Sequence, residues 1–399
     1  MRTNQDVSIS STRLQRIALI VGLLFLVIGI VGGVLGNLER FFQSYLLAFM
    51  FWLGIGLGSL AFLLLHYLTG SRWGLAVRRI TEAGAGTLWL LAILFIPLLF
   101  DLPAIFQWAR PGATADPVIQ LKSPYLNVPS FIVRAVIYFA IWIALALITN
   151  RRSARWSETE DPQARSGMQG WGAFGLILYG LTMTFASVDW MMSLEPYWHS
   201  AIFGLITIMG QVMSGLCFAV IVLILFPGLG LGRRWNFRTT PVPYQDLGAL
   251  MLALVMAWAY LAYFQLLIIW AGNLPREVAW YYNRSRGGWL GVGAFVGLFQ
   301  FCAPFLILLS KRIRHNLRLL APLSALILVT YLVNLYWQII PAFHPGQFSL
   351  HWLDIVLPIG LGGLWFATFL AVLKRRPALR EEEQKALLAP EYGSEQSVS

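Results

Sequence analysis

Few side chains in this sequence could carry out acid–base chemistry, and most of them stand at the ends of long apolar stretches. They include Asp101, Arg134, Asp189, Glu195 and His199. Histidine titrates near neutral pH, and burial raises the pKa of a carboxyl group toward the same range. Such a set could accept and pass protons if the fold brings its members together.

The elements that carry these residues are membrane-spanning. Hydrophobic residues make up 58% of the 399 and charged residues 12%, and the mean hydropathy is +0.68. A soluble domain needs far more surface charge than this. A bilayer crossing takes about 20 apolar residues. Ten stretches meet that length: Ile17–Gly36, Phe42–Leu68, Gly86–Phe106, Phe131–Thr149, Gly170–Trp190, Ala201–Phe226, Leu247–Gly272, Trp289–Ser310, Leu319–Ile340 and Trp352–Leu373.

Backbone polar groups in lipid must be satisfied within the spanning segment, so these stretches predict helices rather than strands. We therefore expect an all-α polytopic membrane protein. A ten-helix transmembrane domain over residues 17–373 follows an N-terminal segment, 1–16, and precedes a polar tail, 374–399. Arg13 and Arg16 before the first span resemble the start of a signal peptide, but no clear small-residue cleavage site follows and nine more spans do, so we expect a retained signal anchor.

The net charge of +11 could suggest nucleic-acid binding, but the distribution of the basic residues favours the lipid bilayer as partner. About 22 of the 29 lie at the termini and in loops after even-numbered spans, and about 6 in the other loops. The positive-inside rule then places both termini in the cytoplasm. We expect no nucleic-acid partner.

With that orientation, a rise of about 1.5 Å per residue gives the depth of each polar side chain. Asp101, Arg134 and Asp189 fall near the outer ends of the third, fourth and fifth spans, and Glu195 and His199 in the turn before the sixth. We expect Asp189, His199 and Arg134 to line one polar outer cavity, with Asp101 and Glu195 beside it. The alternatives are charges in the headgroup zone, a snorkelling arginine, or a structural ion pair.

Deeper polar residues are mostly neutral. Gln211, Tyr260, Gln265 and Gln300 could continue a proton path inward, with His66 as its cytoplasmic entry. Asparagine and glutamine more commonly hydrogen-bond one helix to another, and that alternative stays open for each residue.

The sequence offers little for a resident redox metal. There are two cysteines and no Cys-x-x-Cys-His motif, so neither an iron–sulfur cluster nor a c-type haem is expected. Five histidines leave a bis-histidine haem formally open, but no two stand out on facing helices at matched depth. We expect no covalent or metal cofactor in this chain.

Three segments together resemble the ActF-type membrane subunit of bacterial alternative complex III, within the NrfD/PsrC-like superfamily. They are Lys122–Asn127 leading into Arg134–Phe139, Asp189–Pro196 leading to Ile202–Gly204, and Gln265–Pro275 preceding Arg286–Trp289. The family pattern has a histidine before the tryptophan of the turn after the fifth span. Here Tyr197 precedes Trp198 and His199 follows it.

The resemblance implies two four-helix bundles plus two peripheral helices in the bacterial inner membrane. It implies a respiratory quinol:cytochrome c oxidoreductase complex, with multihaem cytochrome c subunits, an iron–sulfur subunit and a second NrfD-like membrane subunit as partners. This chain would contribute quinone binding, of ubiquinone or menaquinone, or proton translocation. A secondary transporter and a purely structural scaffold subunit of the same complex are the alternatives.

Overall fold

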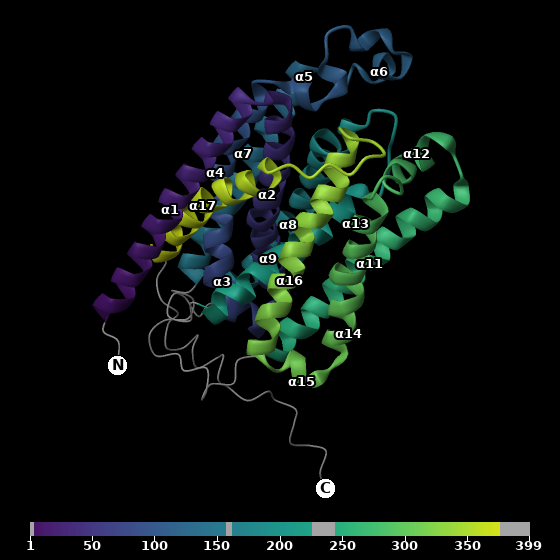
Figure 1. Ribbon diagram of the computed structural model, residues 1–399. Helices are drawn as coiled ribbons and strands as arrows, with labels where there is room; N and C mark the ends of the chain where they lie inside the picture. Colours follow the sequence, from purple (N-terminus) through teal and green to yellow (C-terminus); the bar gives the residue numbers. More distant parts are fainter. Residues whose placement is uncertain (1–3, 157–161, 226–243, 376–399) are drawn as a thin grey trace.

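The computed structural model describes residues 4–156, 162–225 and 244–375, and within these ranges all regular structure is helical (Figure 1). Ten helical segments are long and apolar enough to cross a membrane: Thr12–Leu35, Leu38–Thr69, Trp73–Leu99, Val128–Ser153, Gly167–Leu194, Phe203–Leu225, Asp246–Gly272, Trp289–Leu309, Arg318–Ala342 and Leu353–Lys374. The expectation of an all-α multi-pass membrane protein with ten spans is therefore confirmed. The predicted tail beyond residue 375 lies outside the described residues.

The helices that make up the spans form the body of the protein: α1 (Asn4–Leu35), α2 (Leu38–Thr69), α3 (Arg72–Ala85), α4 (Leu88–Phe95), α7 (Val128–Trp156), α8 (Pro162–Trp190), α9 (Phe203–Leu225), α11 (Tyr244–Gly272), α13 (Trp289–Val296), α14 (Ala303–Leu309), α16 (Leu317–Ile339) and α17 (Leu353–Lys374). Short helices connect them: η1 (Ile96–Leu99), α5 (Leu102–Ile105), η2 (Gln107–Ala109), η3 (Ala113–Ala115), α6 (Pro117–Lys122), η4 (Met192–Leu194), α12 (Pro275–Asn283), α15 (Lys311–Arg314) and η6 (Ile340–Ala342). A π-helical turn, η5 (Gly297–Cys302), joins α13 to α14.

The third span begins earlier than the sequence suggested. We expected it to start at Gly86, which leaves Arg78 and Glu82 outside the span. Instead α3 enters the bundle with both of these side chains buried, 3.7 Å apart as an i,i+4 ion pair. Pairing offsets part of the cost of removing each charge from water, which allows the helix to carry them inside.

Helix α2 is the centre of the fold and is buried from Arg40 to Tyr67. It packs against α3, α8, α9 and α17. A close glycine contact lies on this helix, where a Cβ at Gly58 would collide with the main chain of α9 at Gln211. Gly215 on α9 faces Gly58 in return. Two opposed glycines let the helix backbones touch, which is a common way for membrane helices to pack.

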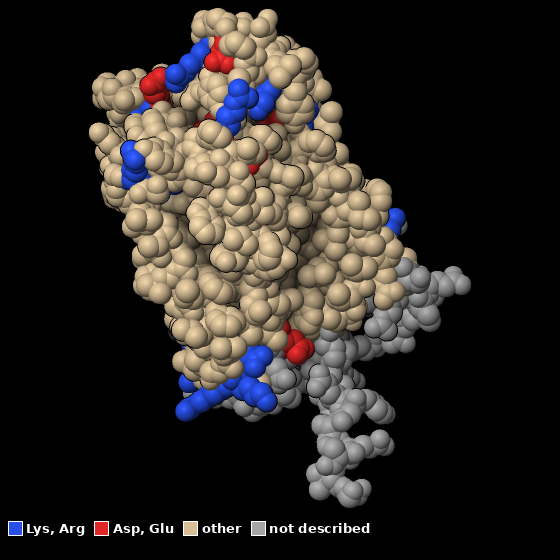
Figure 2. All heavy atoms as spheres, turned by 90° about the vertical axis from the view of Figure 1, so that its right-hand side faces the viewer, with Lys and Arg blue, Asp and Glu red and all other residues tan. Residues whose placement is uncertain are grey.

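On the face shown in Figure 2, most of the charged side chains lie toward the two ends of the molecule, and few lie between them. One end carries α5, α6 and α12 and is called the α12 end; the other carries α15 and is called the α15 end (Figure 1). At the α15 end, Lys374 donates to the side chains of Thr12 and Gln15, so α17 finishes where α1 begins its apolar stretch.

Candidate functional site

Three buried arginine–carboxylate ion pairs lie at the α12 end. They join Arg40 to Asp354 at 2.6 Å, Arg134 to Asp189 at 2.8 Å and Arg284 to Glu195 at 2.7 Å. In each pair, the two residues are far apart in the sequence. A buried charge that loses its partner is strongly destabilising, so these pairs join their segments firmly.

Arg134 on α7 and Asp189 on α8 form a bidentate ion pair. Arg134 donates from Nε to Oδ2 of Asp189 at 2.8 Å and from Nη2 to Oδ1 at 3.0 Å. Tyr138, one turn along α7, donates its hydroxyl hydrogen to the same Oδ2 at 2.8 Å. The Asp189 side chain is 0% exposed. The structure thus brings together two of the three residues that were expected to share an outer cavity.

Arg134 has a second set of partners on its other side. Its Nη1 donates to the main-chain oxygen of Tyr125 at 2.9 Å and to the hydroxyl of Ser130 at 2.5 Å. The guanidinium also lies 3.8 Å from the centre of the Tyr125 ring. These groups are neutral acceptors and a ring face, so Arg134 keeps favourable contacts even when Asp189 is uncharged.

A cavity of about 400 Å³ lies next to this pair, and we call it the His199 cavity. Its walls include Lys122, Tyr125, Ser193 and His199. Burial raises the pKa of Tyr125 to about 12 and lowers that of Lys122, whose ammonium donates to the main-chain oxygen of Pro196 at 2.6 Å. Tyr125 therefore lines the cavity on one side and stacks on Arg134 on the other.

His199 stands at the open rim of this cavity. Its side chain is 70% exposed, and its Nε2 lies 3.7 Å from Oε1 of Glu277 on α12. The imidazole therefore faces solvent and a surface carboxylate. The expected trio divides into a buried pair, Arg134 with Asp189, and a peripheral histidine on the far side of the cavity wall.

Glu195 belongs to a different site from Asp189. It pairs with Arg284, which is buried and donates to the main-chain oxygens of Trp280, Trp337 and Gln338 at 3.1, 3.1 and 2.7 Å. Burial lowers the pKa of Arg284, and the Glu195 carboxylate opposes that shift. The carboxylate and the three carbonyls therefore fix this guanidinium in one position.

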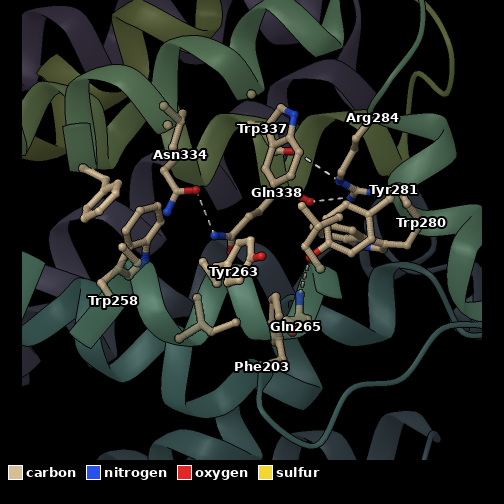
Figure 3. Close-up of a pocket in the computed structure, with 18 of the residues that line it drawn as sticks. Phe203, Trp258, Tyr263, Gln265, Trp280, Tyr281, Arg284, Asn334, Trp337 and Gln338 are labelled. Atoms are coloured by element: carbon tan, nitrogen blue, oxygen red, sulfur yellow. Dashed lines mark hydrogen bonds between the residues drawn. The ribbon is translucent and has the colours of Figure 1, made fainter. Parts of the chain in front are cut away.

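Beside Arg284 is a second hollow, of about 420 Å³, which we call the aromatic pocket (Figure 3). It lies between α11, α12, α13 and α16, and aromatic rings from α9, α11, α12, η5 and α16 form part of its wall. Its aromatic residues are Phe203, Trp258, Tyr263, Trp280, Tyr281, Phe301 and Trp337. Pockets of this size lined by apolar rings with a few polar groups are typical of small-molecule sites.

Hydrogen bonds link polar side chains in two walls of the aromatic pocket. Ser200 donates to Oε1 of Gln265 at 2.8 Å, and Nε2 of Gln265 donates to the hydroxyl of Tyr281 at 3.1 Å. On the other wall, Nε2 of Gln338 donates to Oδ1 of Asn334 at 3.1 Å (Figure 3). Gln265, expected on a proton path, is therefore a pocket residue.

The remaining predicted residues are dispersed. Asp101 caps α5, accepting from the Ala104 N–H at 3.3 Å. Gln211 is buried in mid-bundle and accepts from the Tyr179 hydroxyl at 2.7 Å. Tyr260 is 59% exposed on the outside of α11, so it does not lie beneath Asp189.

The last two expected path residues, Gln300 and His66, are buried far from the His199 cavity. Gln300 lies in η5, and neither of its amide atoms has a hydrogen-bond partner among the residues that the structure describes. His66 packs against the rings of Tyr67 and Trp73 near the α15 end of α2. Within the described ranges, no three His, Cys, Asp or Glu side chains cluster as metal ligands would.

Several important side chains were not singled out from the sequence. Tyr138 could have been, because a position four residues after Arg134 shares its helix face. Arg284 lies between the seventh and eighth expected spans, and Arg40 between the first and second. Nothing in their local sequence indicates that each would be buried against a carboxylate distant in the chain.

Known proteins add no direct guide to these sites. A comparison of the sequence with models of protein families gives no match, and a comparison with curated proteins gives none either.

Proposed function

We propose that this chain is an ActF-type membrane subunit of a quinol-oxidising respiratory complex in a bacterial cytoplasmic membrane. In this proposal both termini face the cytoplasm, the α12 end faces outward, and the ten spans form two four-helix bundles with two peripheral helices. Multihaem cytochrome c subunits, an iron–sulfur subunit and a second NrfD-like membrane subunit are its partners. The three sequence segments that resemble the family, and the placement of the basic residues, support this assignment.

The observation that carries the proposal is the buried Arg134–Asp189–Tyr138 group beside the His199 cavity. Quinol oxidation releases two protons, which must leave a low-dielectric site through groups that can accept them. Asp189 is an ionisable group in the membrane interior, where such residues are costly and usually functional. Its position behind Tyr125, beside a cavity whose wall carries Lys122, Ser193 and His199, suits proton release toward the α12 end.

The contacts of Arg134 suggest how the carboxylate could take and give back a proton. While Asp189 is charged, Arg134 holds it with two hydrogen bonds. When Asp189 is protonated, the guanidinium remains bound to Tyr125 and Ser130. As the ion pair closes again, the proton passes to the imidazole of His199 in the cavity wall, which relays it outward. We assign Asp189 as the proton carrier and Arg134 as the residue that drives its release.

Two variants test this role in the intact complex. We expect Asp189→Asn and Arg134→Leu to assemble with haem-containing partners and to lower quinol oxidation and proton release by about 100-fold, the size of a lost acid–base group. The measurements are the haem absorbance of the purified complex, its rate of quinol oxidation under anaerobic conditions, and its release of protons into vesicles. Unchanged rates in both variants would leave the chain as a structural scaffold.

The Arg40–Asp354 pair provides the matched control. It is buried at the same end of the bundle, but none of its partners lines the His199 cavity, whereas Arg134 binds Tyr125, which does. Asp354→Asn should reduce stability without selectively reducing proton release. Equal losses in Asp189→Asn and Asp354→Asn would show that both pairs act only by holding helices together.

A further inference from the structure

We propose that the His199 cavity binds the phosphate of an anionic phospholipid from the leaflet at the α12 end, with an acyl chain of that lipid lying along α8. The inference goes beyond the proposed function and does not depend on it, because a lipid site requires only that the protein spans a bilayer. Three features carry it: a lysine with hydrogens to spare, a buried donor without an acceptor, and an apolar stripe that leads from the cavity into the membrane.

Lys122 supplies the positive charge of the site. Its ammonium donates to the main-chain oxygen of Pro196 at 2.6 Å, and this bond uses one of its three hydrogens. Burial lowers the pKa of Lys122, so its charge lacks part of the solvation that it would have in water. A phosphate oxygen beside the ammonium would accept a remaining hydrogen in a charge-assisted hydrogen bond and offset that loss.

The protein does not provide this anion itself. The wall of the cavity, within the ranges that the structure describes, contains no aspartate or glutamate. The carboxylates of neighbouring segments have other partners: Asp116 has Tyr197, Asp189 has Arg134, and Glu277 has His199. Among the described residues, Lys122 therefore lines the cavity without a counter-ion.

A second donor in the cavity wall lacks an acceptor. Trp198 is 3% exposed, and its Nε1 has no hydrogen-bond partner among the described residues. The ring is held by Trp280, whose centre lies 4.7 Å away with the two planes inclined by 17°. Buried donors in folded proteins are almost always paired, so an acceptor is expected at the edge of this ring. A phosphodiester has two unesterified oxygens, and it could accept from both Lys122 and Trp198.

An apolar stripe connects the cavity to the bilayer. Val188 lines the cavity, and the residues that follow it on α8 at intervals of three or four are Phe185, Leu181, Ile177 and Phe174. This spacing places them on one face of the helix, and the last four are 51–66% exposed. The stripe is about 21 Å long, more than one hydrocarbon leaflet of about 15 Å. An acyl chain along it would reach the bilayer centre while the phosphate stays in the cavity.

These features favour a phospholipid over a soluble phosphate compound. Leu121 lines the cavity from α6 and is 82% exposed, so the cavity has apolar wall residues on the α6 side as well as on the α8 side. A soluble phosphate would leave this surface uncovered, whereas the glycerol and acyl chains of a lipid would cover it. Phosphatidylcholine carries a choline cation that balances its phosphate, so Lys122 should select a lipid with net negative charge, such as phosphatidylglycerol.

The test uses phosphatidylglycerol with a photoreactive diazirine on one acyl chain, added to the protein purified in detergent with whatever subunits accompany it. We expect cross-links to residues 174–188 of α8, and we expect unlabelled phosphatidylglycerol to suppress them at about fivefold lower concentration than phosphatidylcholine. Equal suppression by the two lipids would show ordinary annular lipid. Suppression by glycerophosphoglycerol or inorganic phosphate would show a site for soluble phosphates. Either result, or cross-links confined to other helices, would overturn the proposal.

Two substitutions, each with a matched control, locate the head group. Lys122→Gln should abolish the preference for phosphatidylglycerol, whereas Arg110→Gln should keep it, because Arg110 is exposed beyond α5 but does not line the cavity. Trp198→Phe retains a ring and removes the Nε1 hydrogen, so phosphatidylglycerol should bind about fivefold more weakly. The control is Trp365→Phe, which removes an equally unpartnered indole N–H outside the cavity.

The preference is a ratio between two lipids, so a smaller yield of folded protein does not imitate its loss. An unchanged preference in Lys122→Gln together with unchanged affinity in Trp198→Phe would overturn the site.

The outcomes separate this inference from the proposed function. If the chain purifies without haem-containing partners yet shows the selective cross-links, the respiratory assignment fails and the lipid site stands. If haem-containing partners co-purify and the cross-links show no selectivity, the lipid site fails and the respiratory assignment stands. The two roles are compatible, because an anion in the cavity favours the protonated imidazole of His199.

Discussion

Arg40 and Asp354 join the first turn of α2 to the first turn of α17 across 314 positions of sequence, with Nη2 and Oδ2 2.6 Å apart. Ser44 donates to the other carboxylate oxygen at 2.6 Å, and the His351 N–H donates to Oδ2 at 2.9 Å. Asp189 is held in the same way, by one arginine and one hydroxyl. The two sites therefore share a design in which every carboxylate oxygen has a partner before it is buried.

The first prediction concerns the energetics of the Arg134–Asp189 pair. Arg134→Leu or Asp189→Leu alone leaves a buried charge without its partner, and we expect either change to cost about 3–5 kcal/mol of stability. The double variant removes both charges and should be more stable than either single variant. Thermal unfolding in detergent measures this, and additive losses in the double variant would contradict it.

The second prediction concerns the contact between α2 and α9. Gly58→Leu places a side chain against the main chain of α9, and we expect a loss of about 1–3 kcal/mol or more, as for other overpacked cores. Gly180→Leu is the control, since a Cβ at Gly180 has open space around it. The unfolding midpoint should fall in the first variant alone; equal midpoints would show that the helices can move apart.

The third prediction is a pH dependence at the turn before α17. Burial and the charge of Arg40 lower the pKa of His351 below its ordinary value of 6.5, although Asp354 opposes this. The unfolded chain therefore binds this proton more readily, so stability is complete above pH 6.5 and falls as the pH drops below it. Protonation also removes the acceptor at Nδ1 that the Leu353 N–H uses.

His344 titrates in the same direction, for the same principal reason. We therefore expect the unfolding midpoint to fall between pH 7.5 and pH 5.5, and the double variant His344→Gln/His351→Gln to show a flatter dependence. A steeper fall in that variant would assign the acid sensitivity to other groups.

The fourth prediction concerns Arg284. A lysine cannot reach Glu195 and three main-chain oxygens together, because its ammonium is a single point of contact. Arg284→Lys should therefore cost about 2–4 kcal/mol, through the acceptors left buried and unpaired. Hydrogen exchange at the end of α16 should accelerate. Unchanged exchange there would mean that Arg284 does not hold Trp337 and Gln338 in place.

The fifth prediction tests orientation. Cysteines introduced at Asp116 and Lys311 lie at opposite ends of the bundle, in α6's cap and in α15. A membrane-impermeant maleimide added to intact cells should label Asp116→Cys, and label Lys311→Cys only after lysis. The native Cys217 is buried and Cys302 lies within a span, so background labelling should be low. The reverse pattern would invert the proposed topology.

The sequence predicts the spans well because bilayer crossing leaves a strong, local signal in hydropathy. It fails at α3, where the stretch that contains Arg78 and Glu82 is amphipathic rather than uniformly apolar. These two charges pair inside the bundle, and the Ser153 hydroxyl donates to Glu82 there. Local hydropathy cannot reveal a partner that is donated by another helix.

The candidate site shows the same limit at the level of single side chains. Depth along a helix follows from counting residues, which is why Arg134, Asp189 and Glu195 were expected at one end. Direction around the helix depends on packing, so Tyr260 turned out to face outward and Glu195 to face Arg284 rather than Asp189. Residue spacing alone could not place His199 on the exposed rim of its cavity.

The enclosure of α2 has a consequence for how the protein is made. Helix α2 is synthesised before α8, α9 and α17, which help to enclose it, and Asp354, the counter-ion of Arg40, follows Arg40 by 314 residues. Until these helices are synthesised, Arg40 lacks its counter-ion and the glycine-rich surface of α2 lacks its partner helices, in lipid or beside the translocon. Completion of the bundle is thus a late event in biogenesis, and a chain that stops before α17 should be recognised by membrane proteases as unfinished.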